Sequence, residues 1–196
     1  MDPVLGTLIF LFIGISTACL VYLHFLPTGL HPLRNAVSEY GAGRYRFWYQ
    51  AMCINQAVVA FLTAAALATK VAPAPVTTDA ALIALGLARL VISQAPVEAV
   101  KNKRRTVSRT HILMALIIFS SAVVASAAFD RSIAGHADWA NVAGTLRLFK
   151  KSIAFFALLT FLAVAAPRGL RYVGTAERLL YISIIGWFIT VGIHLL

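Results

Sequence analysis

The chain has 196 residues, of which 60% are hydrophobic and 12% are charged, and its formal net charge is +10. Soluble domains carry about 25% charged and 45–50% apolar residues, so a soluble fold of this size cannot hide so much apolar surface. Lipid is the expected solvent, and the basic residues, which mostly lie in short segments between apolar runs, favour membrane-surface contact over nucleic-acid binding.

The first predicted span covers residues 4–26 and contains no Asp, Glu, Lys or Arg. Its length is sufficient to cross a hydrocarbon layer of about 30 Å. We read it as a retained span and not as a signal peptide, because only Met1 and Asp2 precede Pro3 and a basic n-region is missing. The segment that follows, residues 27–47, is called loop one and is the most polar connection.

The second span is predicted at residues 48–69. Its two amides, Asn55 and Gln56, are expected to form hydrogen bonds between helices. The third span, residues 80–93, is the weakest of the six, because it is short and contains Arg89. The orientation of the whole chain depends on whether this segment crosses the membrane.

The remaining spans are predicted at residues 110–129, 146–166 and 176–196. The fifth begins with Arg147, Lys150 and Lys151, whose long side chains are expected to reach toward the lipid head groups. The predicted fold class is therefore an all-α integral membrane protein. It is a single domain over residues 1–196, a six-helix bundle with a structured polar loop between helices 1 and 2.

Strict alternation of six spans places loops one, three and five on the same membrane face. These loops hold eleven Lys and Arg, against five on the opposite face. Basic residues favour the cytoplasmic side. We therefore predict a multi-pass protein of the cell membrane with both termini outside.

Polar side chains collect on the same predicted cytoplasmic face. They come from the end of span one, loop one, the exit of span three, and the starts of spans four and six: His24, His31, Arg34, Asn35, Ser38, Glu39, Tyr40, Arg89, Ser93, Gln94, Glu98, His111, Glu177 and Arg178. Loops are polar in any case, but this explains Arg89 and His111 less well, because apolar residues flank both. An ionisable residue within a span is a candidate functional residue with a partner. For Arg89 the natural partner is Glu98, with Glu39 and Glu177 as alternatives.

The string HFLPTGLHPLRNAVSEYGAG, from His24 to Gly43, resembles the signature loop of the bacterial and archaeal membrane family known as domain of unknown function 998. Further similar features are Pro96 with Glu98, His111 at the start of span four, and Glu177 to Leu179 at the start of span six. The resemblance implies six spans over nearly the whole chain. It implies no activity.

Two functions are compatible with this polar face. The first is the binding or movement of an anionic lipid or amphiphile, since guanidinium groups hold phosphate and carboxylate bidentately. The predicted ligand-binding residues are His31, Arg34, Asn35, Tyr40, Arg89, Glu98, Glu177 and Arg178. The second is a hydrolase or transferase acting on a lipid, with Ser38, Glu39 and His111 as the catalytic candidates. Ser38 or Tyr40 would be the nucleophile or acid, His111 or His31 the base, and Glu39 or Glu98 the orienting acid.

Three other interpretations remain open. Paired imidazoles of His24 and His111 would ligate haem iron, although neither a cofactor nor a metal is expected. A non-catalytic structural role would make the Ser38–Glu39 segment a loop fold, with Glu39 pairing to Arg34. The expected partners are membrane lipids and not nucleic acid, and self-association into a homo-oligomer is a further alternative.

Overall fold

The structure is a computed structural model that describes residues 3–71, 75–95, 109–165 and 172–196. Its six long helices are α1 (Pro3–Phe25), α2 (Arg46–Lys70), α3 (Val76–Gln94), α4 (Arg109–Ser132), α5 (Ala140–Ala165) and α6 (Val173–Leu195). Two short 3-10 helices, η1 (Val37–Ala42) and η2 (Ala137–Trp139), precede α2 and α5. All six long helices are long and apolar enough to cross a membrane, which confirms the predicted six-helix membrane fold.

All six helices begin before the start that the sequence pattern indicated, and two of them begin four or more residues earlier. Helix α3 starts at Val76, four residues before the predicted start, and its 19 residues give a length of about 28 Å. It is therefore long enough to span the hydrocarbon layer with little tilt. Helix α5 starts at Ala140, six residues before the predicted start.

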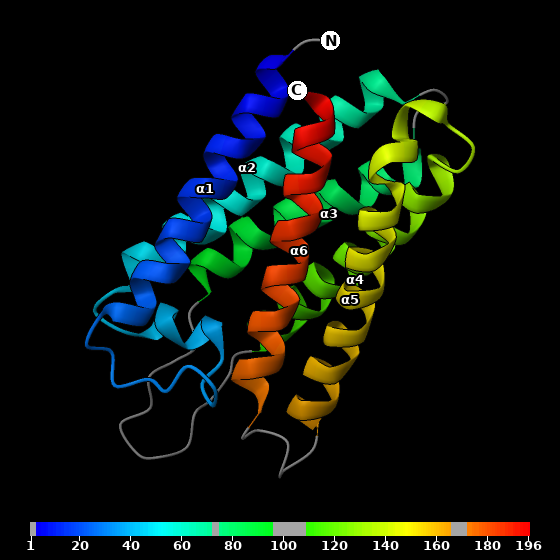
Figure 1. The fold of residues 1–196 in the computed structure, drawn as a ribbon. Helices are drawn as coiled ribbons and strands as arrows, with labels where there is room; N and C mark the ends of the chain where they lie inside the picture. Colours follow the sequence, from blue (N-terminus) through cyan, green and yellow to red (C-terminus); the bar gives the residue numbers. More distant parts are fainter. Residues whose placement is uncertain (1–2, 72–74, 96–108, 166–171) are drawn as a thin grey trace.

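Each helix packs against the next one along the chain, and α1 packs against α6 to close the arrangement. The two termini lie at one end of the bundle, and loop one lies at the other (Figure 1). We call the latter the loop-one end; it also holds the last turn of α3 and the first turns of α4 and α6. The closing contact is tight, because a Cβ added to Gly6 would lie 3.2 Å from the carbonyl oxygen of Gly192.

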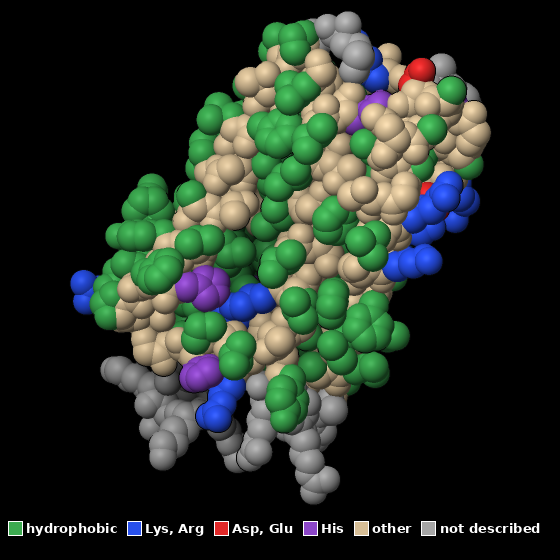
Figure 2. All heavy atoms as spheres, in the orientation of Figure 1, with side chains coloured by type: hydrophobic (Ala, Val, Ile, Leu, Met, Phe, Trp, Pro, Cys, Tyr) green, Lys and Arg blue, Asp and Glu red, His purple; other side chains and the backbone are tan. Residues whose placement is uncertain are grey.

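Hydrophobic side chains cover much of the outer surface, as expected for helices in contact with lipid (Figure 2). On α5 the exposed stripe includes Leu148, Phe155, Leu158 and Leu162. Basic side chains gather mainly beside α5 and at the loop-one end (Figure 2). Apolar residues of all six helices also fill the interior of the bundle.

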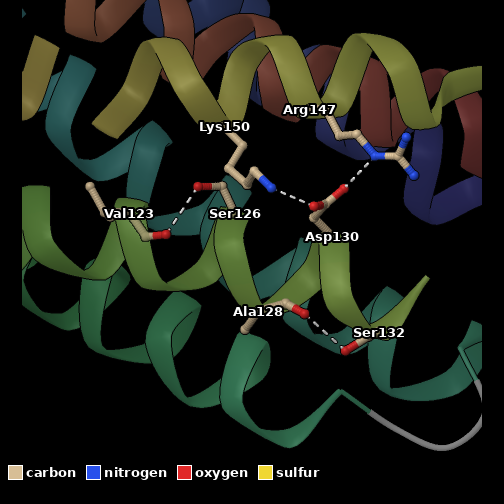
Figure 3. A network of polar contacts seen from close by, with 7 residues as sticks. All are labelled: Val123, Ser126, Ala128, Asp130, Ser132, Arg147 and Lys150. Atoms are coloured by element: carbon tan, nitrogen blue, oxygen red, sulfur yellow. Dashed lines mark hydrogen bonds and ion pairs between the residues drawn. The ribbon is translucent and has the colours of Figure 1, made fainter. Parts of the chain in front are cut away.

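The basic residues of α5 lie deeper along the helix than expected. Because α5 begins at Ala140, Arg147 and Lys150 sit two to three turns from its start and not in its first turn. Both form ion pairs with Asp130 near the end of α4, and the Arg147 Nε–Asp130 Oδ1 distance is 3.2 Å (Figure 3). Lys151 points outward and is exposed.

Candidate functional site

Loop one is fastened to the start of α6, mainly by Arg178. This guanidinium donates from Nε to His24 Nε2 at 2.7 Å and from Nη1 to the Asn35 carbonyl oxygen at 2.8 Å. Nη1 also donates to the Gly174 carbonyl at 2.9 Å, and Nη2 donates to the Tyr40 hydroxyl at 3.4 Å. Arg178 thus joins α1, loop one and α6, and we call this set of contacts the clasp.

Neighbouring residues of α6 complete the clasp. The buried carboxylate of Glu177 accepts a hydrogen bond from the Val37 backbone N–H at 2.7 Å. Thr175 donates from both its backbone N–H and its hydroxyl to the Leu33 carbonyl, each at 3.2 Å. At Gly174 the backbone of α6 lies directly against the backbone of loop one, since a Cβ on Gly174 would lie 2.6 Å from the Asn35 carbonyl oxygen.

Within loop one, Asn35 and Glu39 organise the turn that leads into η1. The Asn35 side-chain amide donates to Glu39 Oε2 at 2.6 Å, and its oxygen accepts from the His31 backbone N–H at 2.7 Å. Glu39 Oε1 also accepts from the Ala36 backbone N–H at 3.1 Å. These contacts are those of a folded loop, and they occupy both carboxylate oxygens of the proposed orienting acid. Ser38 is half-buried inside η1.

A second group of polar side chains lies inside the bundle around Arg89. Its side chain is only 2% exposed, and Nη1 donates to the Tyr181 hydroxyl at 2.6 Å. The guanidinium carbon also lies 4.8 Å from the centre of the Tyr181 ring, in cation–π geometry. The Cys53 thiol of α2 interacts with Arg89 and with Tyr49, and all three residues are buried.

The Arg89 group borders the clasp through Glu177. The charges of Arg178, Arg89 and Glu39 all act on the Glu177 carboxylate. Among the described residues, however, Arg89 forms no ion pair with a carboxylate, and its Nε has no hydrogen-bond partner. Glu98, the partner predicted first for Arg89, lies outside the described residues.

The two histidines considered for haem hold structural contacts. His24 Nδ1 lies 2.6 Å from the Leu20 carbonyl oxygen, while Nε2 accepts from Arg178. Ligation of iron by His24 would therefore break one bond of the clasp. His111 Nδ1 lies 3.0 Å from the Ala95 carbonyl oxygen, at the junction of α3 and α4. The described residues contain no group of three His, Cys, Asp or Glu side chains placed to hold a metal ion.

The structure brings together many of the predicted site residues, but in two separate groups of contacts. The clasp contains Asn35, Tyr40, Glu177 and Arg178, whereas Arg89 lies among residues of α2 and α6. The side chains of His31 and Arg34 are exposed in loop one. No direct signal in the sequence pointed to Tyr49, Cys53 and Tyr181, although Tyr181 follows Glu177 by one helical turn.

The family model described as "Protein of unknown function (DUF998)" matches residues 5–194 of the chain. This match covers all six helices and agrees with the resemblance carried by loop one. Searches of curated proteins and of solved structures found no match.

Proposed function

The chain belongs to the DUF998 family, and from that premise we propose that this multi-pass membrane protein binds the anionic head group of a lipid or similar amphiphile through Arg89. The clasp supports the site from the loop-one end. We further propose that this end faces the cytoplasm, because the eleven basic residues of loops one, three and five favour that side.

The observation that carries the proposal is the incomplete pairing of the Arg89 guanidinium. Arginine stays protonated in proteins and offers five N–H donors. Burying such a charge costs several kcal/mol unless good geometry and further hydrogen bonds compensate it. Within the described residues the Arg89 guanidinium has one hydroxyl, one thiol and one aromatic ring as neighbours, and its Nε has no acceptor. The Glu177 carboxylate acts on Arg89 electrostatically but forms no ion pair with it. A phosphate or carboxylate would supply a directly paired negative charge and the missing acceptor.

The depth of Arg89 fits the head group of an amphiphile. It lies five residues before the end of α3 at Gln94, which is about 7.5 Å along the helix. An anionic group at that depth is close to the membrane surface while its apolar chain remains in the hydrocarbon layer. Exposed Arg34 and His31 stand at the same end and are proposed as outer contacts for the arriving head group.

Lipid that co-purifies with the protein provides the test. We expect wild-type protein to retain an anionic lipid in native mass spectrometry and the Arg89→Gln variant to lose it. Arg131→Gln is the matched control, because it removes the same charge from an exposed position at the C-terminal end of α4, which is opposite the loop-one end. Equal lipid retention by wild type and Arg89→Gln would overturn the proposal.

A second measurement covers the case in which Arg89→Gln does not fold. We expect phosphatidylglycerol to raise the melting temperature of the wild type above its value in phosphatidylcholine. Arg89→Lys keeps the charge but loses the bidentate geometry, so most of this difference should disappear. An undiminished difference in Arg89→Lys would also contradict the proposal.

A further inference from the structure

Helix α5 carries three basic side chains, Arg147, Lys150 and Lys151, well inside its length. The helix has 26 residues, Ala140–Ala165, so Lys151 lies about 16 Å from its first residue and about 21 Å from its last. Basic side chains are visible beside α5 between the two ends of the bundle (Figure 2). We call the three basic residues and Asp130 of α4 the α5 basic cluster.

The α5 basic cluster carries more positive charge than its one carboxylate balances. Arg147 and Lys150 both turn toward α4 and share Asp130 (Figure 3). The side chain of Lys151 is exposed and forms no ion pair within the part of the chain that the structure describes. Three cations and one carboxylate leave a net charge of +2 on this side of the bundle.

Lys151 stands within a stripe of apolar side chains that face outward. The members of this stripe follow one another at intervals of three or four residues, which places them on one face of the helix: Leu148, Lys151, Phe155, Leu158 and Leu162. The four apolar members are 57–62% exposed. Because lipid is the solvent on this face, a lone charge at Lys151 is costly unless the flexible side chain turns toward the surface and meets a counter-charge there.

The order of charge and apolar surface along α5 matches a phospholipid of the leaflet at the end that holds both termini. Trp139, just before α5, lies against His194 at the end of α6, with ring centroids 3.8 Å apart. Arg147 is therefore nearer that membrane surface, Lys151 is one turn deeper, and the apolar part of the stripe from Phe155 onward continues toward the middle of the membrane. A head group beside the two cations thus places its acyl chain on the apolar residues.

We propose that Arg147 and Lys151 bind the head group of an anionic phospholipid in this leaflet, with an acyl chain along the apolar stripe. Basic side chains near a membrane surface attract anionic lipids. The contact of Arg147 with Asp130 uses Nε, so the other N–H groups of this exposed guanidinium can reach a phosphate. The site lies at the opposite end of the bundle from the loop-one end and does not depend on what Arg89 binds.

Photolabelling within the bilayer provides the test, because a lipid on the outer surface exchanges with its neighbours and need not survive purification. The probes are phosphatidylglycerol and phosphatidylcholine, each with a diazirine in the acyl chain, as traces in phosphatidylcholine vesicles. Mass spectrometry of peptides gives the ratio of the two labels on each helix. We expect a several-fold excess of the phosphatidylglycerol label on α5. The two labels should be equal on α1, which exposes Leu11 and Ile15 and contains no Lys or Arg. Equal labelling of α5 by both probes would overturn the proposal.

Lys151→Gln should bring the label ratio of α5 close to that of α1. Lys70→Gln is the matched control, because it removes the same charge from an exposed lysine at the end of α2, on the same side of the membrane. This control should leave the α5 ratio unchanged. An undiminished ratio in Lys151→Gln, or an equal fall in Lys70→Gln, would contradict a specific site on α5.

Asp130→Asn should change the ratio in the opposite direction, which a folding defect would not imitate. The substitution releases Arg147 and Lys150 and raises the net charge of the cluster from +2 to +3, so the α5 preference for phosphatidylglycerol should increase. A ratio at or below that of wild type would refute the proposal. If a second copy of the chain covers this face, neither probe will label α5 while both label α1, and that outcome would also refute it. Loss of lipid by Arg89→Gln concerns the other site and should leave the α5 ratio unchanged.

Discussion

Replacement of Gly174 by Ala tests whether the clasp stabilises the fold. The added Cβ would lie 2.6 Å from the Asn35 carbonyl oxygen and 2.7 Å from the Pro32 carbonyl oxygen. Both neighbours are backbone atoms, so neither can turn away as a flexible side chain does. The third close atom, Arg178 Nη1 at 2.9 Å, is itself held by the clasp. Relief of the overlap requires loop one to move away from α6.

Overpacking of this kind costs about 1–3 kcal/mol. For a chain of this size each kcal/mol corresponds to about 2–4 °C in melting temperature, so Gly174→Ala should melt several degrees below wild type. A thiol-reactive fluorophore can report unfolding, because Cys19 and Cys53 are both buried.

Gly14→Ala serves as the control for Gly174→Ala. No atom lies within 4 Å of a Cβ placed on Gly14 in α1, and alanine favours helix formation over glycine. This variant should melt at or slightly above the wild-type temperature. If Gly174→Ala and Gly14→Ala melt together at the wild-type temperature, the close seating of loop one on α6 is refuted.

The remaining predictions concern three other parts of the chain. Tyr181→Phe removes the hydroxyl that accepts from Arg89 and should cost about 1.5–3 kcal/mol, visible as a lower melting temperature; an unchanged value would mean that this bond adds nothing. Asp130→Asn should cost less than about 1 kcal/mol, because its two ion pairs are partly exposed, and a loss much above that in the same melting assay would contradict this. Of two reporters fused after Leu196, one that works only outside the cell and one that works only in the cytoplasm, the first should be active and the second inactive. Activity of the cytoplasmic reporter would reverse the proposed orientation.

The sequence was sufficient to predict the spans and the end of the bundle at which polar residues gather. Runs of apolar residues determine where helices cross a bilayer, and the alternation of six crossings then places loop one and the start of α6 together. The contacts of Glu177 and Arg178 with loop one are consistent with this reasoning. Asn35 and Glu39 are one helical turn apart in sequence, so their contact is also close to what local spacing suggests.

The sequence was not sufficient to predict which polar side chains meet across the bundle. Arg89 and Tyr181 are 92 residues apart and belong to helices that are not consecutive. Their contact depends on the rotation and depth of α3 relative to α6, which no local pattern encodes. For the same reason the described residues do not show the interhelical hydrogen bonds expected of Asn55 and Gln56. Asn55 bonds to the Ala51 carbonyl of its own helix, and the buried Gln56 Oε1 has no partner among those residues.

Helix α6 connects the clasp to the Arg89 group. Glu177 and Tyr181 are one turn apart on the same side of the helix; the first accepts from loop one and the second accepts from Arg89. Any displacement of loop one that rotates the start of α6 therefore also moves the Tyr181 hydroxyl relative to the Arg89 guanidinium. On this basis we expect the seating of loop one to be coupled to the proposed binding of an anion by Arg89, and Gly174→Ala should weaken lipid retention even though Gly174 is distant in sequence from α3.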